Sequence, residues 1–340
     1  MKGKLVLLDA GMAALMIDGK VMDLLIDPPD DDLTPRPEAI YRGILDRPLK
    51  GMGGAIIKLP DGQSGFLKDA KGIAPGTPLL VQVSTFTEAQ KASPVATRLL
   101  FKSRYCIVTP DAPGINIARS IRDDEERVRL MDIATETMAG VSYGLIVRSS
   151  ASGVDDDEII DDIKQMLSAA EAVLSESDDK TPELLLDAPT AAEKAWREWS
   201  DVDQVIDEAG CFERYDVLDE IENAMRPRVP LSTGFLLIEP TAALIAIDVN
   251  TGGDNSPAAA LKTNLAATKE ISRHLKLRGL GGQITIDFAP CSKRDRIQIE
   301  NALKSALKRD GVDTIIAGWT PLGNMELQRK RERYPLGRIT

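Results

Sequence analysis

Three polar side chains in the last third of the sequence could bind a metal ion. Asp248 and Asn250 are two residues apart at the end of the apolar run 243–250, so in an extended chain they point to the same side. Asp287 has the same place at the end of a second apolar run, 283–288. Two neighbouring carboxylates repel each other, and Mg²⁺ removes that conflict because it prefers carboxylate, amide and water oxygens. Such an ion can activate water and stabilise charge on a phosphoryl group.

The segment between these residues decides whether they can meet. Ser256-Pro257 has the form of a helix N-cap followed by proline at the first helical position. The side chains of one helical face then recur at spacings of 4, 3, 3 and 4, at Leu261, Leu265, Thr268, Ile271 and Leu275. Strand, helix and strand in this order suggest a crossover between parallel neighbours, which would bring both aspartates to one sheet edge. The alternative is that they only cap strand ends.

Basic residues around this segment fit a polyanionic ligand. Residues 262–340 carry a net +8 and the whole chain −11, so residues 1–261 carry −19. Four cations at spacings of 7, 4 and 3 form one stripe of the expected helix: Lys262, Lys269, Arg273 and Lys276. Lysine and arginine near a metal–carboxylate site suit a phosphodiester backbone. An ordinary solvated face is the other interpretation of this stripe.

Histidine and cysteine usage excludes several kinds of site. The single histidine, His274, argues against His-based acid–base catalysis and multi-histidine metal sites, and a surface or dipole role is expected for it. Cys106, Cys211 and Cys291 lie far apart, without a zinc-knuckle or disulfide pattern, which predicts a reducing cytoplasmic location. No apolar run approaches the ~20 residues that span a bilayer, so we expect no membrane partner.

The first part of the chain is predicted to be rich in strands. Three short strands are expected within 4–26, and five within 39–110, at 40–45, 55–59, 65–67, 79–83 and 101–108. Five short β-strands suit a small OB-type barrel, and such barrels bind single-stranded nucleic acid through aromatic and basic side chains. Phe66, Lys91 and Lys102 are the candidates, although Phe66 could instead belong to the core. Helices are predicted at 122–140, 155–174, 191–199 and 215–225, and strands at 141–150 and 184–186.

These motifs, taken in order, resemble the ribonuclease E/G family of bacterial endoribonucleases. The segments that carry the resemblance are Gly65–Leu67, Gly144–Arg148, Gly234–Glu239, Ala246–Gly252, Lys262–Leu265, Leu275–Gly282 and Ile284–Phe288. The resemblance implies an α+β multidomain chain. Its RNase H-like scaffold would be formed by residues 1–38 and 183–230, with two domains inserted between these segments. The insertions would be an OB-type RNA-binding domain at 39–105 and a 5′-sensor at 106–182. A DNase I-like α/β catalytic domain would follow at 231–340.

The resemblance also implies an activity. Asp248 and Asp287 would bind the catalytic Mg²⁺, for which Mn²⁺ would substitute, and Asn250 would hold and orient Asp287. The protein would cut single-stranded RNA, leaving 5′-phosphate and 3′-hydroxyl ends, in RNA processing or decay. Arg148, Ser149 and Arg119 would hold a 5′-monophosphate, since a guanidinium suits that forked, doubly charged group. Phe66 and Lys91 would grip RNA in the barrel.

Some positions depart from the family pattern. Ile56 replaces a second barrel aromatic, the loop after Asn250 is short, and no second acidic residue follows Asp287. The sequence ends at Thr340 without the Cys-x-x-Cys zinc link, so we expect no structural zinc, no zinc-linked assembly and no degradosome-recruiting tail. A homodimer without a zinc link stays open. The alternatives are an RNA-binding relative with weak or no nuclease activity, and a DNase or other phosphodiesterase.

Overall fold

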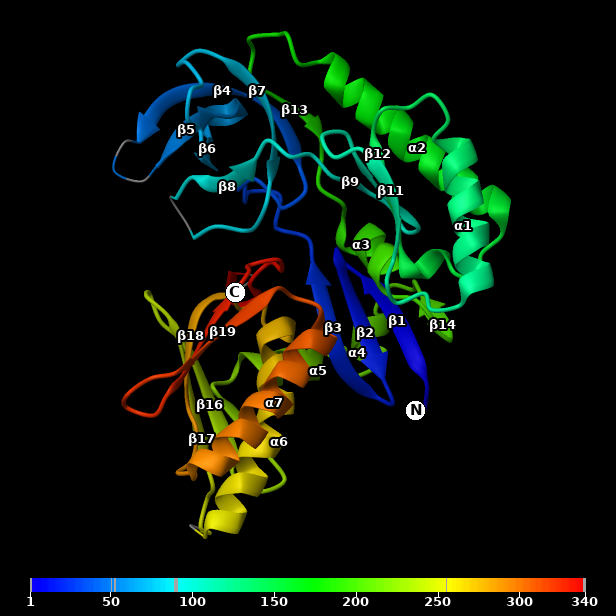
Figure 1. The fold of residues 1–340 in the computed structure, drawn as a ribbon. Helices are drawn as coiled ribbons and strands as arrows, with labels where there is room; N and C mark the ends of the chain where they lie inside the picture. Colours follow the sequence, from blue (N-terminus) through cyan, green and yellow to red (C-terminus); the bar gives the residue numbers. More distant parts are fainter. Residues whose placement is uncertain (1, 50, 52, 89–90, 255, 339–340) are drawn as a thin grey trace. The chain divides into compact units, whose positions relative to one another are not determined.

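The computed structural model describes residues 2–49, 51, 53–88, 91–254 and 256–338 (Figure 1). The chain divides into two compact units. The first unit comprises residues 1–31 and 201–340, and the second comprises residues 32–200. The resemblance-based scaffold segment 183–230 is therefore shared between them. None of the helices in the described ranges is long and apolar enough to cross a membrane.

The second unit contains a closed barrel of five strands, which is consistent with the OB-type domain predicted from the sequence. The barrel order is β4 (Ile40–Leu49), β5 (Gly54–Lys58), β6 (Ser64–Lys68), β8 (Ser93–Ala96) and β7 (Pro78–Val83). The barrel closes because β7 also pairs with β4. The short 3₁₀ turn η1 (Pro60–Gly62) joins β5 to β6, and β13 (Glu183–Leu186) adds to β4 from outside the barrel.

The identity of the fifth barrel strand corrects the sequence prediction. The run 101–108 is not one barrel strand: it divides into β9 (Phe101–Lys102) and β10 (Cys106–Thr109). These two pair with each other in a separate sheet, ordered β11 (Gly114–Ile117), β12 (Gly144–Val147), β10 and β9. The missed barrel strand, β8, is short, contains Pro94 and pairs in parallel with β6, so local alternation gave no signal for it.

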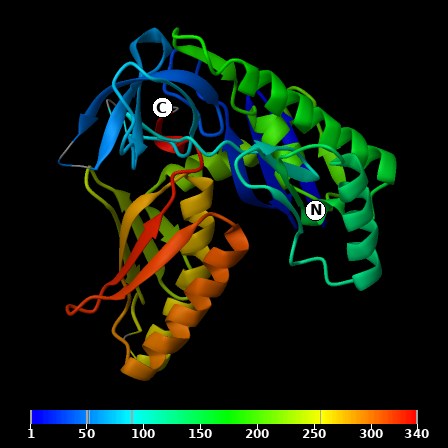
Figure 2. The same cartoon turned by 45° about the horizontal axis from the view of Figure 1, so that its top comes forward.

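Two helices cover this second sheet. They are α1 (Asp124–Thr137) and α2 (Asp156–Ser175), and both views show them along one side of the sheet (Figure 1, Figure 2). Ile159, Ile163 and Leu167 of α2 are buried in the shared core with Val108 and Val147. The helix predicted over 155–174 is therefore confirmed, and its apolar side faces the sheet. The remaining elements of the unit are η2 (Ser149–Ala151) and α3 (Ala191–Glu198).

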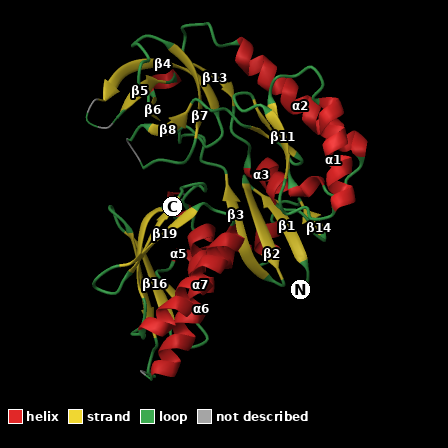
Figure 3. Cartoon of the chain, in the orientation of Figure 1, coloured by secondary structure: helices red, strands yellow, loops and turns green. Residues whose placement is uncertain are grey.

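The first unit contains two sheets (Figure 3). The smaller is ordered β14 (Gln204–Ile206), β1 (Lys4–Asp9), β2 (Met12–Ile17) and β3 (Lys20–Ile26). The short helices α4 (Cys211–Arg214) and α5 (Val217–Met225) belong to the same core as this sheet. The three N-terminal strands and the helix near 215–225 agree with the sequence prediction.

The larger sheet of the first unit carries the candidate site. Its order is β15 (Arg228–Pro230), β16 (Phe235–Pro240), β17 (Ile245–Asn250), β18 (Gly282–Asp287), β20 (Met325–Arg329) and β19 (Thr314–Trp319). Helices α6 (Pro257–Leu277) and α7 (Lys293–Asp310) pack against one of its faces (Figure 1). The short turn η3 (Leu336–Arg338) follows the last strand. We call the face that these two helices leave uncovered the open face.

Candidate active site

Asp248 and Asp287 lie directly opposite each other on neighbouring parallel strands. β17 and β18 pair in parallel from Ile245↔Ile284 to Asp248↔Asp287. Helix α6 is the crossover between them, as the sequence predicted. Because neighbouring strands lie about 4.8 Å apart, register partners on a parallel ladder bring their side chains together on one face. The expected convergence at the carboxyl ends of both strands is present.

Strand alternation places both aspartates on the open face. Ile245, Ile247 and Val249 are buried in one core with α6 residues Ile271 and Leu275. Asp248 has the opposite orientation in β17 and is exposed, and Asp287 is exposed at the end of β18. The pair is therefore accessible to solvent and to a ligand that lies across the sheet.

Asn250 differs from the expectation. Its amide Nδ2 donates a 2.7 Å hydrogen bond to Oδ2 of Asp248, whereas the family resemblance implied that it holds Asp287. The reason is geometric. The β17–β18 ladder ends at the Asp248↔Asp287 pair, so Asn250 has no partner residue on β18, and its nearest same-side neighbour along the strand is Asp248.

The donor set fits Mg²⁺ better than zinc. Within the described ranges, no group of three or more His, Cys, Asp and Glu residues could hold a metal ion. A structural zinc needs four such ligands. Mg²⁺ instead keeps several waters and is commonly held by one or two carboxylates together with substrate phosphates. Two exposed carboxylates on one sheet face meet that requirement.

Two of the four helix cations predicted to face RNA are used inside the protein. Arg273 is only 9% exposed; its Nε donates to the Val21 carbonyl at 2.7 Å and its Nη2 bonds Glu220 at 2.5 Å. Lys276 pairs at 2.8 Å with Asp23, a carboxylate that is itself buried. These contacts fasten α6 to β3, and they correct the prediction of a continuous solvent-facing stripe.

The other two helix cations, Lys262 and Lys269, are exposed. They lie on α6, in the layer that covers the opposite side of the sheet from Asp248 and Asp287. Their contact with RNA stays a prediction, but they do not share the open face with the carboxylates.

His274 is a buried structural residue, which corrects the expected surface role. It is 6% exposed, and Arg278 Nε donates to its Nδ1 at 3.3 Å. Burial, followed by the charges of Arg278, Arg273 and Lys20, lowers the pKa of His274 to about 3. The imidazole is therefore neutral near pH 7 and takes no part in the candidate site.

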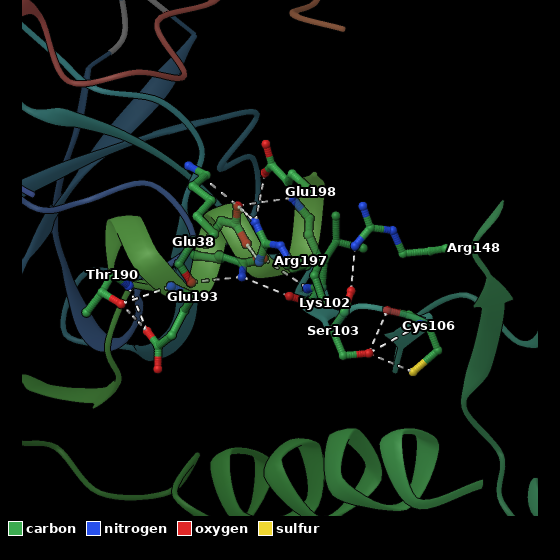
Figure 4. A network of polar contacts seen from close by, with 12 residues as sticks. Glu38, Lys102, Ser103, Cys106, Arg148, Thr190, Glu193, Arg197 and Glu198 are labelled. Atoms are coloured by element: carbon green, nitrogen blue, oxygen red, sulfur yellow. Dashed lines mark hydrogen bonds and ion pairs between the residues drawn. The ribbon is translucent and has the colours of Figure 1, made fainter. Parts of the chain in front are cut away.

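The predicted 5′-phosphate residues also follow the ends of parallel strands. Ile117 of β11 pairs with Val147 of β12, so Arg119 and Arg148 both lie just beyond the carboxyl ends of this pair. Arg119 and Ser149 are exposed. Arg148 is half-buried and its Nη1 donates to the Ser103 carbonyl at 2.5 Å (Figure 4). Burial and the charge of Arg197 lower the pKa of Arg148.

A dense ion-pair network lies beside Arg148 (Figure 4). Arg197 binds Glu38 through two hydrogen bonds of 2.7 and 2.8 Å, and Lys102 approaches the same carboxylate at 3.7 Å. Burial would raise the pKa of Glu38, but Arg197, Lys102 and Lys194 together lower it. Lys102 thus lies on β9 within this network, which corrects its predicted place on the barrel. A cavity of about 640 Å³ is lined by Glu38, Lys102 and Arg197 among others.

Phe66 and Lys91 remain on the outside of the barrel. Phe66 pairs with Ile56 across β6 and β5, and both are half-buried, whereas the adjacent Leu67 and Ile57 belong to the barrel core. The Phe66 ring lies over Gly54, where an added Cβ would be 2.7 Å from its Cζ. Lys91 is 67% exposed at its side chain and pairs with Glu88.

One residue near the candidate site was not singled out from the sequence. Arg228 is exposed on β15, and its guanidinium lies 3.5 Å from the centre of the Phe235 ring. The sequence signal that could have indicated it is the apolar Val229 next to Arg228 in Arg228-Val229-Pro230. In the structure only Val229 of these three residues is buried.

Comparison with known proteins places the chain in a family. The family model described as the ribonuclease E/G family matches residues 101–209 and 200–332. The chain belongs to the ribonuclease E/G family. It is 30% identical to a protein named Ribonuclease E from Nostoc sp. and 31% identical to one from Synechocystis sp., with 86% of this chain aligned in each case. It is 29% identical to a Ribonuclease G from Salmonella typhimurium, again over 86% of the chain.

The lengths of these ribonuclease E/G relatives differ from that of the chain. The alignments cover 51% and 52% of the two cyanobacterial proteins and 72% of the Salmonella protein. The chain therefore spans about half the length of the cyanobacterial relatives.

Proposed function

We propose that this member of the ribonuclease E/G family is an Mg²⁺-dependent endoribonuclease that cuts single-stranded RNA. The observation that carries the proposal is the direct pairing of Asp248 with Asp287 on the open face, in a chain of this family. The family resemblance further supports an RNase H-like scaffold, whose predicted segments 1–38 and 183–230 fall in both units, and a DNase I-like catalytic domain within the first unit. It also supports an RNA-binding role for the barrel of the second.

The two carboxylates would hold the ion in the proposed reaction. Mg²⁺, or Mn²⁺ in its place, supplies charge neutralisation at the scissile phosphate and activation of a water molecule. Asp248 and Asp287 would hold the ion from adjacent strands, and Asn250 restricts the rotation of Asp248 through their hydrogen bond. The water oxygen bonds to phosphorus while the bond to the 3′ oxygen breaks. The products are a 5′-phosphate and, after proton transfer, a 3′-hydroxyl.

The second unit would select the substrate. Arg148, Ser149 and Arg119 would bind a 5′-monophosphate beside the ends of β11 and β12. Phe66 offers a half-exposed ring for base stacking, and Lys91 a cation for the backbone. In the first unit, Lys262 and Lys269 of α6 would add two exposed cations for RNA. A cytoplasmic location and a homodimer without a zinc link stay predictions from the sequence.

Cleavage of a defined oligonucleotide tests the proposal. The substrate is a 5′-monophosphorylated single-stranded RNA with Mg²⁺, and Asp248→Asn and Asp287→Asn should each abolish cleavage. Glu239→Gln is the matched control, because it removes one exposed carboxylate from the next strand of the sheet. Cleavage by either aspartate variant at the rate of the unchanged protein would refute the mechanism. The same sequence as DNA separates a ribonuclease from a general phosphodiesterase.

A further inference from the structure

Arg228 shares one row of the open face with the two candidate metal ligands. Pairing across the sheet is continuous: Arg228↔Leu237 between β15 and β16, Leu237↔Asp248 between β16 and β17, and Asp248↔Asp287 between β17 and β18. Because strands lie about 4.8 Å apart, the Cα atoms of Arg228 and Asp248 are about 10 Å apart.

The burial pattern shows that Arg228 points to the same side as the aspartates. Val229, its neighbour, is buried in the core between the sheet and α6, as are Leu236 and Val249. Arg228, Phe235 and Asp248 alternate with these residues and lie on the other face.

Contacts hold the guanidinium near the end of β17. It lies 3.5 Å from the centre of the Phe235 ring, and Phe235 is the register partner of Asn250. Stacking on an aromatic ring limits the conformations of a long side chain and leaves the N–H groups of the guanidinium free to donate. Among the residues that the structure describes, no carboxylate forms an ion pair with Arg228.

This arrangement suits a phosphate. An exposed arginine normally gains little from being held in one position, but here Phe235 holds a cation in the same row of the sheet as two carboxylates that would bind a metal ion. A planar guanidinium fork matches phosphate oxygens. The helix cations that the sequence pointed to are either used inside the protein or lie on the other side of the sheet, so they do not fill this role.

We propose that Arg228 binds a backbone phosphate of the RNA adjacent to the phosphate that is cut, so that the strand crosses the open face from β18 towards β15. The inference rests on the proposed function, because it takes Asp248 and Asp287 as the cleavage point. It names Arg228 as a substrate-binding residue that sets the direction of the strand.

The test measures how RNA affinity depends on salt. A single-stranded, 5′-monophosphorylated oligoribonucleotide with fluorescein at its 3′ end is titrated with protein in EDTA at several KCl concentrations, and binding is followed by anisotropy. Arg228→Ala should weaken binding and lower the slope of log K against log[salt] by about 0.7, the value for one phosphate on a single strand. In cleavage assays with Mg²⁺, Arg228→Ala should raise KM more than it lowers kcat, because the contact exists before the chemical step.

Two variants serve as comparisons. Arg226→Ala removes the same charge two residues away, where Arg226 pairs with Glu222 at 2.7 Å, and it should leave the slope unchanged. Arg228→Lys should keep the slope but not restore the wild-type KM, because a lysine cannot form the planar fork.

The outcomes separate this inference from the proposed function. An unchanged salt slope for Arg228→Ala overturns it, and a lower melting temperature with that unchanged slope would assign Arg228 a purely structural role. RNA binding that depends on Arg228 in a protein that does not cleave would support the inference and refute the nuclease proposal. RNA cleavage by the protein, together with an Arg228→Ala salt slope equal to that of the wild type, would support the nuclease proposal and refute the inference about Arg228.

Discussion

Asn250 donates its side-chain amide to Asp248, two residues earlier on the same strand, and not to Asp287 across the sheet. The bond joins a residue that lies beyond the end of the β17–β18 ladder to one of the last paired residues within it. It holds the Asp248 carboxylate in one orientation, so the geometry of the proposed metal site depends on a residue that need not contact the ion.

Removing this amide should impair the site without unfolding it. We expect Asn250→Ala to lower Mg²⁺ affinity or cleavage about 10- to 100-fold, the usual effect of losing a residue that orients a metal ligand. The measurement is the cleavage rate over a range of Mg²⁺ concentrations. Because Asn250 is half-buried at a strand end, the Asn250→Ala protein should have nearly the same melting temperature as the wild type. An unaltered Mg²⁺ dependence would show that the hydrogen bond does not orient a metal ligand.

Mg²⁺ should stabilise the unchanged protein and not the aspartate variants. In a chelator, Asp248→Asn and Asp287→Asn should melt no lower than the unchanged protein, because each removes one of two repelling carboxylates. At an Mg²⁺ concentration ten times the Kd, binding should stabilise the unchanged protein by about 1.4 kcal/mol. Differential scanning calorimetry with and without Mg²⁺ measures both effects. Equal stabilisation of all three proteins would place the ion elsewhere.

Arg148→Ala should remove any preference for RNA with a 5′-monophosphate over RNA with a 5′-hydroxyl. The guanidinium is already anchored at Ser103 and lies beside the end of β12, so it can meet a phosphate at little entropic cost. Competition between the two RNAs in one reaction gives the preference directly. Lys164→Ala, which removes an exposed charge from α2, is the control. Should the preference persist in Arg148→Ala, the residue is not the sensor.

Cations on α6 should separate into two classes. Arg273→Ala should reduce the free energy of unfolding by about 2 kcal/mol, because it removes hydrogen bonds from a buried guanidinium to Val21 and Glu220. Lys269→Ala should leave stability unchanged and affect only RNA affinity, since Lys269 is exposed. Urea denaturation and RNA binding, measured on both variants, distinguish the classes. Equal stability of the two variants would contradict the packing described for α6.

His274 should make the first unit less stable in mild acid. Its pKa is about 3 in the folded protein and about 6.5 when unfolded, so the unfolded state takes up a proton first as the pH falls below 6.5. The loss should reach about 2 kcal/mol at pH 5 and continue towards pH 3. The measurement is urea denaturation at pH 7 and pH 5. His274→Gln should show a correspondingly smaller difference between the two pH values, and an identical difference would contradict the burial of a neutral imidazole.

The sequence was sufficient to predict the main elements of the candidate site. A strand, a helix with Ser256-Pro257 at its start, and a second strand leave one common topology, and that topology sets Asp248 beside Asp287. The same reasoning could not show what covers the helix. Spacings of 7, 4 and 3 prove only that Lys262, Lys269, Arg273 and Lys276 share a side of α6, and β3, over 200 residues earlier, buries one end of that side.

The barrel shows a related limit. Four of its strands overlap the apolar runs that the sequence predicted, at 40–45, 55–59, 65–67 and 79–83. The fifth, β8, depends on pairing with β6 and β7, and its own sequence, Ser93-Pro94-Val95-Ala96, carries little strand signal. The register that links Arg228 to Asp248 is also invisible in the sequence, because it depends on how two successive antiparallel pairings, β15 with β16 and β16 with β17, align their residues.

The placement of β18 between β17 and β20 has a consequence during synthesis of the protein. The second aspartate is made 39 residues after the first, and the strand that bears it is flanked on its far side by residues 325–329. A growing chain on the ribosome therefore presents only the first of the two carboxylates until β18 has emerged and paired with β17. If the protein cuts RNA as proposed, it becomes able to do so only after the message that encodes these residues has been translated.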